Sequence, residues 1–121
     1  MLINLTNHPF EKWSDAQKQA AMQFGECIDL PFPFVDPMAD KTDIDQLTDQ
    51  YLQKILEMAQ DEDTEIVVHL MGEMSFVYTL LEKLRVCNIL SVLSTTERVS
   101  VDLGDGERVI KFNFVRFRSY Y

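Results

Sequence analysis

The stretch Ile66-Val67-Val68-His69-Leu70-Met71-Gly72 decides the fold of this chain of 121 residues. A continuous apolar run, broken only by His69, is typical of a strand that is covered on both faces, as in a parallel sheet. We interpret His69 as a neutral, hydrogen-bonded histidine of the core. Gly72 ends the run, and the apolar positions that follow predict a helix from about Ser75. The stretch therefore predicts a strand, a turn and a helix at the centre of a layered α/β domain.

Shorter apolar runs and capped amphipathic segments alternate on either side of this unit. Further strands are expected at Leu2–Leu5, Cys27–Leu30 and Ile89–Leu93. One helix is expected after a capping-box pattern that begins at Ser14, and Gly25 is well placed to end it. A second is expected after a cap at Thr42 or Asp43, closed by the polar loop Asp61-Glu62-Asp63.

This alternation of strands and helices predicts a parallel sheet, because right-handed crossovers place each helix on a face of the sheet. The economical strand order is 2-1-3-4. In the remaining C-terminal part Val99, Val101 and Leu103 alternate with polar residues, Gly104-Asp105-Gly106 makes a tight turn, and 109–117 returns as a strand, which is typical of a β-hairpin. We therefore predict one α/β domain over residues 1–121. It has a mostly parallel sheet, three helices and a C-terminal antiparallel hairpin that extends or folds over one edge.

Composition and charge narrow the function. Hydrophobic residues make up 46% of the chain, and its formal net charge is -9. This acidic balance argues against binding of duplex nucleic acid, because many Lys and Arg are needed to neutralise its phosphates. Ten acids lie between Asp36 and Glu65, whereas five bases lie between Arg98 and Tyr121. A small anionic ligand is therefore expected near the C-terminal part.

Nothing in the sequence suggests export or insertion into a membrane. The apolar runs are too short for a membrane span, and the first residues lack the cationic lead-in of a secretory signal. Cys27 and Cys87 lie far apart, which indicates buried thiols in a reducing compartment. We expect a cytoplasmic protein with no membrane partner.

Candidate functional residues gather at one predicted edge of the sheet. In open parallel sheets, ligands bind beyond the carboxyl ends of the strands, at the point where the strand order reverses. For the order 2-1-3-4, this point lies between the first and third strands. Three predicted loops meet there or next to it: Asn7-His8-Pro9, Met71-Gly72-Glu73-Met74-Ser75 and Ser94-Thr95-Thr96-Glu97-Arg98.

Two of these loops suit a phosphate. Gly72 permits close approach of the backbone, and the helix after it offers free N–H groups; the alternative is a turn glycine beside a helix cap. Arg98 can hold a phosphate by two hydrogen bonds, assisted by the hydroxyls of Ser94, Thr95 and Thr96. The alternative is a polar connection with an exposed arginine. The glycine patterns of phosphate loops and dinucleotide sites are missing, which argues against those ligands.

Two side chains are candidates for proton transfer. His8 follows the first strand directly, where it can serve as a general acid or base, or as a turn residue that bonds a backbone carbonyl. Glu73 is the strongest carboxylate candidate, followed by Glu97, which can instead pair with Arg98. No metal site and no cofactor are expected, because two histidines without nearby cysteines or paired carboxylates do not match a zinc site.

The last strand interleaves aromatic and basic residues. They are Phe112, Phe114, Phe117, Tyr120 and Tyr121, with Lys111, Arg116 and Arg118. Proteins that bind single-stranded nucleic acids use this combination. An amphipathic edge strand or a dimer surface is the alternative.

Taken together, the segments Asn7-His8-Pro9, Met71-Gly72-Glu73-Met74-Ser75-Phe76 and Ser94-Thr95-Thr96-Glu97-Arg98 resemble those of the small standalone CRISPR-associated proteins of type III systems. These resemble the Rossmann-like CARF domains that bind cyclic oligoadenylate, and some are ring nucleases. The resemblance covers most of the chain in length and element order. It implies one CARF-like domain over residues 1–121, acting as a homodimer in antiviral defence, with a cyclic oligoadenylate across the two-fold axis. It also implies cleavage without a metal, by attack of a ribose 2′-hydroxyl on the adjacent phosphate.

The resemblance also implies roles for single residues. The ligand-binding residues would be Asn7, Gly72, Ser75, Ser94, Thr95 and Thr96. Asn7 would orient the ribose or base, Arg98 would hold phosphate, and His8 or Glu73 would assist proton transfer. The net negative charge of the chain departs from what an anionic ligand requires. The cationic groups must then be concentrated at the site, and Arg98 is the one cationic residue that clearly lies there.

Other functions stay open beside a ring nuclease. One is a catalytically silent module that senses or sequesters the same ligand. Another is a protein-interaction subunit that uses the basic aromatic C-terminal strand. A flavin-binding domain of the flavodoxin type is a further alternative.

Overall fold

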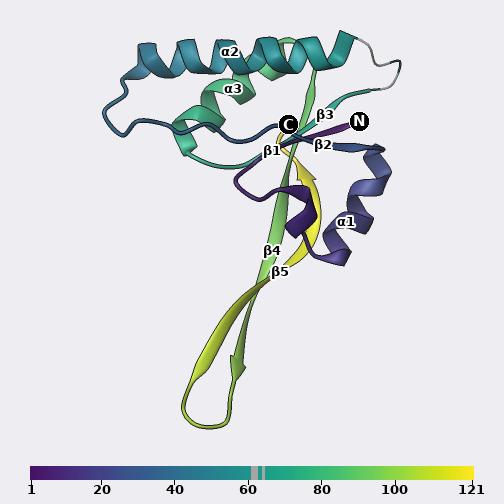
Figure 1. Ribbon diagram of the computed structural model, residues 1–121, viewed down its shortest axis with the longest axis vertical. Helices are drawn as coiled ribbons and strands as arrows, with labels where there is room; N and C mark the ends of the chain where they lie inside the picture. The colour runs from purple at the N-terminus through teal and green to yellow at the C-terminus, as the bar shows by residue number, and fades with distance from the viewer. Residues whose placement is uncertain (61–62, 64) are drawn as a thin grey trace.

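Five strands form one sheet in the computed structural model, which describes residues 1–60, 63 and 65–121 (Figure 1). They are β1 (Leu2–Leu5), β2 (Cys27–Asp29), β3 (Val67–Leu70), β4 (Leu90–Asp102) and β5 (Arg108–Ser119). The first four run parallel to one another, and β5 pairs antiparallel with β4. The mostly parallel α/β sheet is thereby confirmed. The full strand order is 2-1-3-4-5 and not the expected 2-1-3-4, because β5 joins the sheet as its edge strand.

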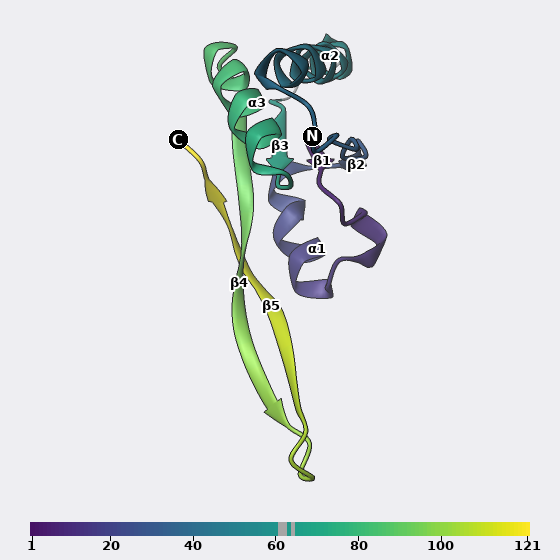
Figure 2. The same cartoon turned by 90° about the vertical axis from the view of Figure 1, so that its left-hand side faces the viewer.

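Three helices flank the sheet, with α2 and α3 on one side and α1 on the other (Figure 2). They are α1 (Asp15–Ala21), α2 (Lys41–Gln60) and α3 (Met74–Val86), with short 3-10 turns η1 (Phe10–Lys12) and η2 (Met22–Phe24). Successive strand residues point to opposite faces of the sheet, so each central strand contributes side chains to two hydrophobic cores. The core under α2 and α3 holds Ile3, Leu5, Val68, Leu70, Phe76 and Leu80. The core beside α1 holds Leu2, Trp13, Val67, Val92 and Phe117.

Caps fix both ends of the segment that contains α1. The Ser14 hydroxyl accepts a hydrogen bond from the backbone N–H of Gln17 at 3.2 Å, as the capping-box pattern predicts. Gly25 follows η2 with a φ of 89°, a left-handed conformation that favours glycine. Both ends of this segment were predicted from the sequence, and both are confirmed.

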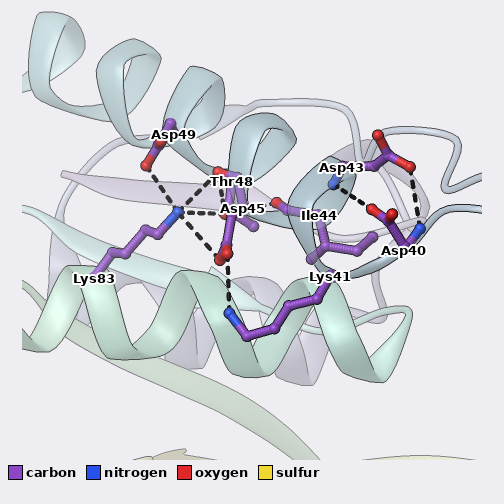
Figure 3. A network of polar contacts seen from close by, with 8 residues as sticks. All are labelled: Asp40, Lys41, Asp43, Ile44, Asp45, Thr48, Asp49 and Lys83. Atoms are coloured by element: carbon purple, nitrogen blue, oxygen red, sulfur yellow. Dashed lines mark hydrogen bonds and ion pairs between the residues drawn. The ribbon is translucent and has the colours of Figure 1, made fainter.

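α2 begins at Lys41, so the expected cap at Thr42 or Asp43 is corrected to Asp40. The carboxylates of Asp40 and Asp43 each accept a hydrogen bond from the backbone N–H of the other, at 3.0 and 3.1 Å (Figure 3). Acidic caps stabilise a helix start because they satisfy free N–H groups at the positive end of the helix dipole. The polar loop Asp61-Glu62-Asp63 lies largely outside the described residues.

Lys83 of α3 fastens α2 and α3 together (Figure 3). Its ammonium group lies 2.7 Å from the Thr48 hydroxyl and 2.7 Å from an Asp49 carboxylate oxygen, and it donates to the Asp45 carbonyl at 2.9 Å. Thr48 is itself fully buried and donates to the Ile44 carbonyl. The positions of the two helices over the sheet are thus set by hydrogen bonds as well as by apolar packing. Among the described residues, no helix is long and apolar enough to cross a membrane.

β4 and β5 extend far beyond the body of the protein as a two-stranded arm (Figures 1 and 2). Leu103 and Glu107 close its tip through a backbone hydrogen bond, and Gly104 and Gly106 have φ values of 88° and 86°. The predicted hairpin with a glycine turn is therefore confirmed. Several apolar side chains of the arm are exposed, among them Leu103, Ile110, Phe112 and Val115.

The loop predicted at Ser94–Arg98 is wrong, because these residues lie inside β4. The prediction ended the fourth strand at Leu93 and began a new one at Val99. In the structure, β5 supplies hydrogen-bonding partners along this whole segment, from Leu93 opposite Arg118 to Asp102 opposite Arg108. Continuous pairing with a partner strand stabilises polar residues that lack a strand pattern of their own.

Candidate functional site

A pocket of about 900 Å³ opens at the carboxyl ends of β1 and β3 and beside the middle of β4, at Ser94 and Thr96. One wall comes from the segment between β1 and α1, with Lys12 and Trp13, and another from the base of the arm, with Phe112 and Phe114. The strand order reverses between β1 and β3, so the pocket lies where open parallel sheets bind their ligands.

The pocket brings together residues from all three segments that were singled out in the sequence. Those that line it are Asn7, His8, Gly72, Ser94 and Thr96. The side chains of Asn7, His8 and Thr96 are exposed, and Ser94 is half-buried. The Ser94 hydroxyl donates to the Met71 sulfur at 3.1 Å, which ties the end of β3 to β4 at the floor of the pocket.

Glu73 and Ser75 do not line the pocket; they form the cap of α3. The Glu73 carboxylate accepts hydrogen bonds from the backbone N–H groups of Ser75 and Phe76 at 3.1 and 2.8 Å, and from the Ser75 hydroxyl. The Ser75 hydroxyl, followed by the Phe76 N–H, holds the pKa of Glu73 below its usual value. The N–H groups that could receive a phosphate from solution are therefore occupied by a carboxylate of the chain itself.

Gly72 is required by packing. A Cβ atom at this position would lie 2.3 Å from the ring of Phe32, well inside van der Waals contact. Phe32 in turn packs against Phe76 at the start of α3, with ring centroids 4.9 Å apart. The local contacts of Gly72 are therefore those of a turn glycine beside a helix cap, which was the alternative to a phosphate site. Gly72 also lines the pocket.

Thr95 and Arg98 lie outside the pocket lining. The Thr95 hydroxyl accepts from the backbone N–H of Arg116 at 3.2 Å and donates to its carbonyl at 3.1 Å, at the irregular step of the β4–β5 ladder. Arg98 is exposed and lies opposite Phe112 in the ladder. Alternation along β4 places Arg98 on the same face as Ser94 and Thr96, farther out on the arm.

Several pocket residues were not among the sequence candidates, notably Lys12, Trp13 and Gln17. They lie just after the first predicted loop, in a short 3-10 turn and the start of α1. Lys12 and Trp13 follow the first strand closely in the sequence, and this position could have identified them as candidates. Their orientation toward the arm depends on tertiary packing, which their position in the sequence does not predict.

The charge of the pocket contrasts with that of the whole chain. Among the described residues that line it, none is an Asp or Glu, and Lys12 contributes a positive charge. The formal net charge of the chain is -9. An anionic ligand therefore meets a lysine and no carboxylate among the described residues of the pocket wall, so local repulsion of its negative charge is small.

Asn4 organises the pocket floor at the end of β1. It is buried, and its amide nitrogen donates to the His8 carbonyl and to an Asp29 carboxylate oxygen, both at 2.8 Å. Both of these partners are acceptors, which fixes the orientation of the amide and directs its oxygen to the Thr6 hydroxyl (2.9 Å) and to His69 Nδ1 (3.1 Å). The Trp13 indole N–H also donates to the His8 carbonyl at 3.0 Å. These bonds hold the His8 backbone and the indole in fixed positions.

His69 lies on the pocket floor with one nitrogen paired and the other unpaired. Because the Asn4 amide oxygen can only accept, His69 Nδ1 carries the proton. Burial lowers the pKa of the imidazole from 6.5 to about 4, so Nε2 is an unprotonated acceptor at neutral pH. Nε2 is buried and has no hydrogen-bond partner among the residues that the structure describes, while the Trp13 and Phe117 rings pack against the imidazole with centroids 5.2 and 5.3 Å away. An unpaired buried acceptor costs about 1–3 kcal/mol.

The comparison with protein families gives one match. The model of the family described as "Uncharacterized protein MJ1673 family" matches residues 1–118, so the chain belongs to this family. Searches of the curated proteins and of the solved structures gave no match.

Proposed function

We propose that this member of the MJ1673 family binds a cyclic oligoadenylate in the pocket at the carboxyl ends of β1 and β3, beside the middle of β4. The observation that carries the proposal is the combination of aromatic side chains, a lysine and no Asp or Glu among the described lining residues, in a strongly acidic chain. Phe112, which is exposed, and Phe114, which is half-buried, offer aromatic surfaces to bases, and Lys12 offers a positive charge to a phosphate; Trp13 also lines the pocket but is largely buried.

The polar residues of the pocket suit the sugar and the phosphate. Asn7 and Gln17 carry amides that can bond ribose hydroxyls or base edges, and Ser94 and Thr96 carry hydroxyls that can bond phosphate oxygens. Arg98, on the same face farther along the arm, is in position for a phosphate at the outer part of a large ring.

The proposed reaction is an internal transfer at phosphorus that needs no metal. The ribose 2′-oxygen forms a bond to the adjacent phosphorus, and the bond from phosphorus to the 5′-oxygen breaks. The products are a 2′,3′-cyclic phosphate and a free 5′-hydroxyl. His8, exposed at the pocket edge, accepts the proton of the 2′-hydroxyl, the leaving 5′-oxygen takes a proton from water, and Lys12 balances the charge on the phosphate. Glu73 is not part of this proposal, because its carboxylate caps α3.

Cyclic tetra-adenylate and cyclic hexa-adenylate test the proposal directly. Trp13 is the single tryptophan of the chain and lines the pocket, so ligand binding should change its fluorescence. Chromatography of the incubated nucleotides, with a chelator present, should show linear products. Lys12→Met should weaken binding, whereas Lys41→Met, which alters a lysine with 86% of its side chain exposed on α2, should not. Absence of binding at micromolar protein with both rings would overturn the proposal.

A catalytically silent module for the same ligand is the second candidate. It is favoured by the absence of Glu73 and Arg98 from the pocket lining, which leaves His8 and Lys12 to support any reaction. Binding of the ring without linear products, in wild type and His8→Ala alike, would select this candidate. Products from wild type that disappear in His8→Ala would select the ring nuclease.

Under either candidate we propose a homodimer that acts in type III CRISPR defence, as the resemblance implies. The exposed apolar residues of the arm support an interaction surface, since an isolated two-stranded hairpin is marginally stable in water. Ile110→Lys should then reduce the dimer measured by sedimentation. If capture of a different protein depends on Ile110 while Lys12→Met has no effect on it, the arm serves a protein-interaction subunit instead.

A further inference from the structure

His69 at the pocket floor has a buried hydrogen-bond acceptor, Nε2, with no partner among the described residues. It is 2% exposed, lies in β3 opposite Asn4 of β1 and Val92 of β4, and lines the pocket. An apolar residue, like Val67 two positions earlier on the same face, would fill this place without leaving a polar atom unpaired. A buried polar atom without a partner points to a group that the free chain does not contain.

The surroundings define what that group can be. Asn4 Oδ1 holds the proton on Nδ1, which leaves a lone pair on Nε2, so the missing partner must donate a hydrogen bond. Trp13 and Phe117 pack against the imidazole but do not donate to Nε2, because the Trp13 indole N–H is bonded to the His8 carbonyl and Phe117 has no polar hydrogen. An aromatic surrounding favours a flat, aromatic donor over a small polar one.

We infer that His69 Nε2 accepts a hydrogen bond from the exocyclic amino group of a bound adenine and thereby distinguishes adenine from bases with an oxygen at the same position. This inference rests on the proposed function, because it concerns a base held in the same pocket. Adenine carries an amino donor at its six position, whereas hypoxanthine and guanine carry an acceptor oxygen there. The oxygen would face the Nε2 lone pair and leave two buried acceptors unpaired.

Nε2 has no exposed surface in the free chain, so binding must displace part of the wall that covers it. Asn4 itself is held by Thr6, His8 and Asp29, which keeps the Nδ1 partner in place during that movement. The proton therefore stays on Nδ1, and Nε2 remains the acceptor when the base arrives. His69 is a specificity-determining residue in this arrangement and takes no part in the transfer at phosphorus.

The test compares cyclic tetra-adenylate with cyclic tetra-inosinate on the unmodified protein, with Trp13 fluorescence as the readout. We expect the inosinate ring to bind at least about tenfold more weakly, as is usual when a buried polar group is left unpaired. Equal affinities for the two rings would overturn the role of His69 and leave the proposed function standing. Absence of binding by either ring would overturn the proposed function itself, and the inference with it.

A variant and a spectroscopic measurement complete the test. His69→Phe keeps a ring but removes both nitrogens, so it should bind the two rings with similar affinity, while Lys41→Met should keep the discrimination. If His69→Phe does not fold, ¹⁵N NMR of the histidine-labelled wild type decides. The Nε2 resonance should be that of an unprotonated nitrogen and should shift on addition of the adenylate ring more than with the inosinate ring. Equal shifts with both rings would contradict the inference.

Discussion

The stability of the fold should fall between neutral and mildly acidic pH because of His69. Its pKa is lowered by burial from 6.5 to about 4. Above pH 6.5, the imidazole is neutral in both the folded and the unfolded chain. Between these two values the unfolded chain binds a proton that the folded chain does not, so the free energy of unfolding decreases as the pH falls.

The size of the effect follows from the two pKa values. At about 1.4 kcal/mol per pH unit, the interval from 6.5 to about 4 corresponds to roughly 3 kcal/mol in total. Roughly 2 kcal/mol of this should be lost between about pH 7.5 and about pH 5. A loss of this size is a large fraction of the stability of a small domain, which is typically about 5–15 kcal/mol.

Urea unfolding followed by circular dichroism at the two pH values measures this loss. The acidic side chains also titrate in this range, so the informative quantity is the difference between wild type and His69→Phe. This variant keeps a ring in the aromatic cluster, and the Asn4 amide oxygen keeps its bond from Thr6. His8→Gln is the matched control, since the His8 side chain is exposed and the variant should retain the wild-type loss. Equal losses in wild type and His69→Phe would refute the reasoning.

Further expectations concern the edge of α3 and the two thiols. Gly72→Ala should lower the free energy of unfolding by about 1–3 kcal/mol in urea titrations, because its Cβ would lie 2.3 Å from the Phe32 ring; an unchanged midpoint would contradict this. Glu73→Ala should cost about 0.5–2 kcal/mol through loss of the cap and leave fluorescence-detected ligand binding unchanged. Reduced binding in this variant at full folding would show that Glu73 reaches the ligand. The predicted burial of both thiols is wrong for Cys87, which is exposed, whereas Cys27 is half-buried. The thiol of Cys27, whose pKa is raised to about 11 mainly by burial, should therefore react with iodoacetamide more slowly than Cys87 in peptide mass spectra. Faster labelling of Cys27 would contradict its burial.

The parallel part of the sheet could be predicted because its signals are local. The run from Ile66 to Leu70 is apolar apart from His69, and the segment that contains α1 begins at the Ser14 cap and ends at Gly25. From these elements, general rules of chain connection place the candidate site at the carboxyl ends of β1 and β3. The pocket lies there, and Asn7, His8 and Gly72 line it.

The rest depended on contacts between residues far apart in the sequence. Ser94–Arg98 has the composition of a loop, and pairing with β5 makes it a strand. Glu73 has the position of a catalytic carboxylate, yet its side chain is short enough to fold back onto the helix that it precedes. The aromatic wall exists because Trp13 and Phe112, about a hundred residues apart, are brought together by the sheet. No local sequence pattern predicts that these two residues lie close together in space.

The arm and the pocket share one piece of sheet. Ser94 and Thr96 from one strand and Phe112 and Phe114 from the other belong both to the pocket wall and to the base of the arm. The tip of the arm lies far from the body of the protein, whereas its base lies at the pocket (Figure 2). A partner that bound along the base of the arm would therefore contact the same two strands that form one wall of the pocket.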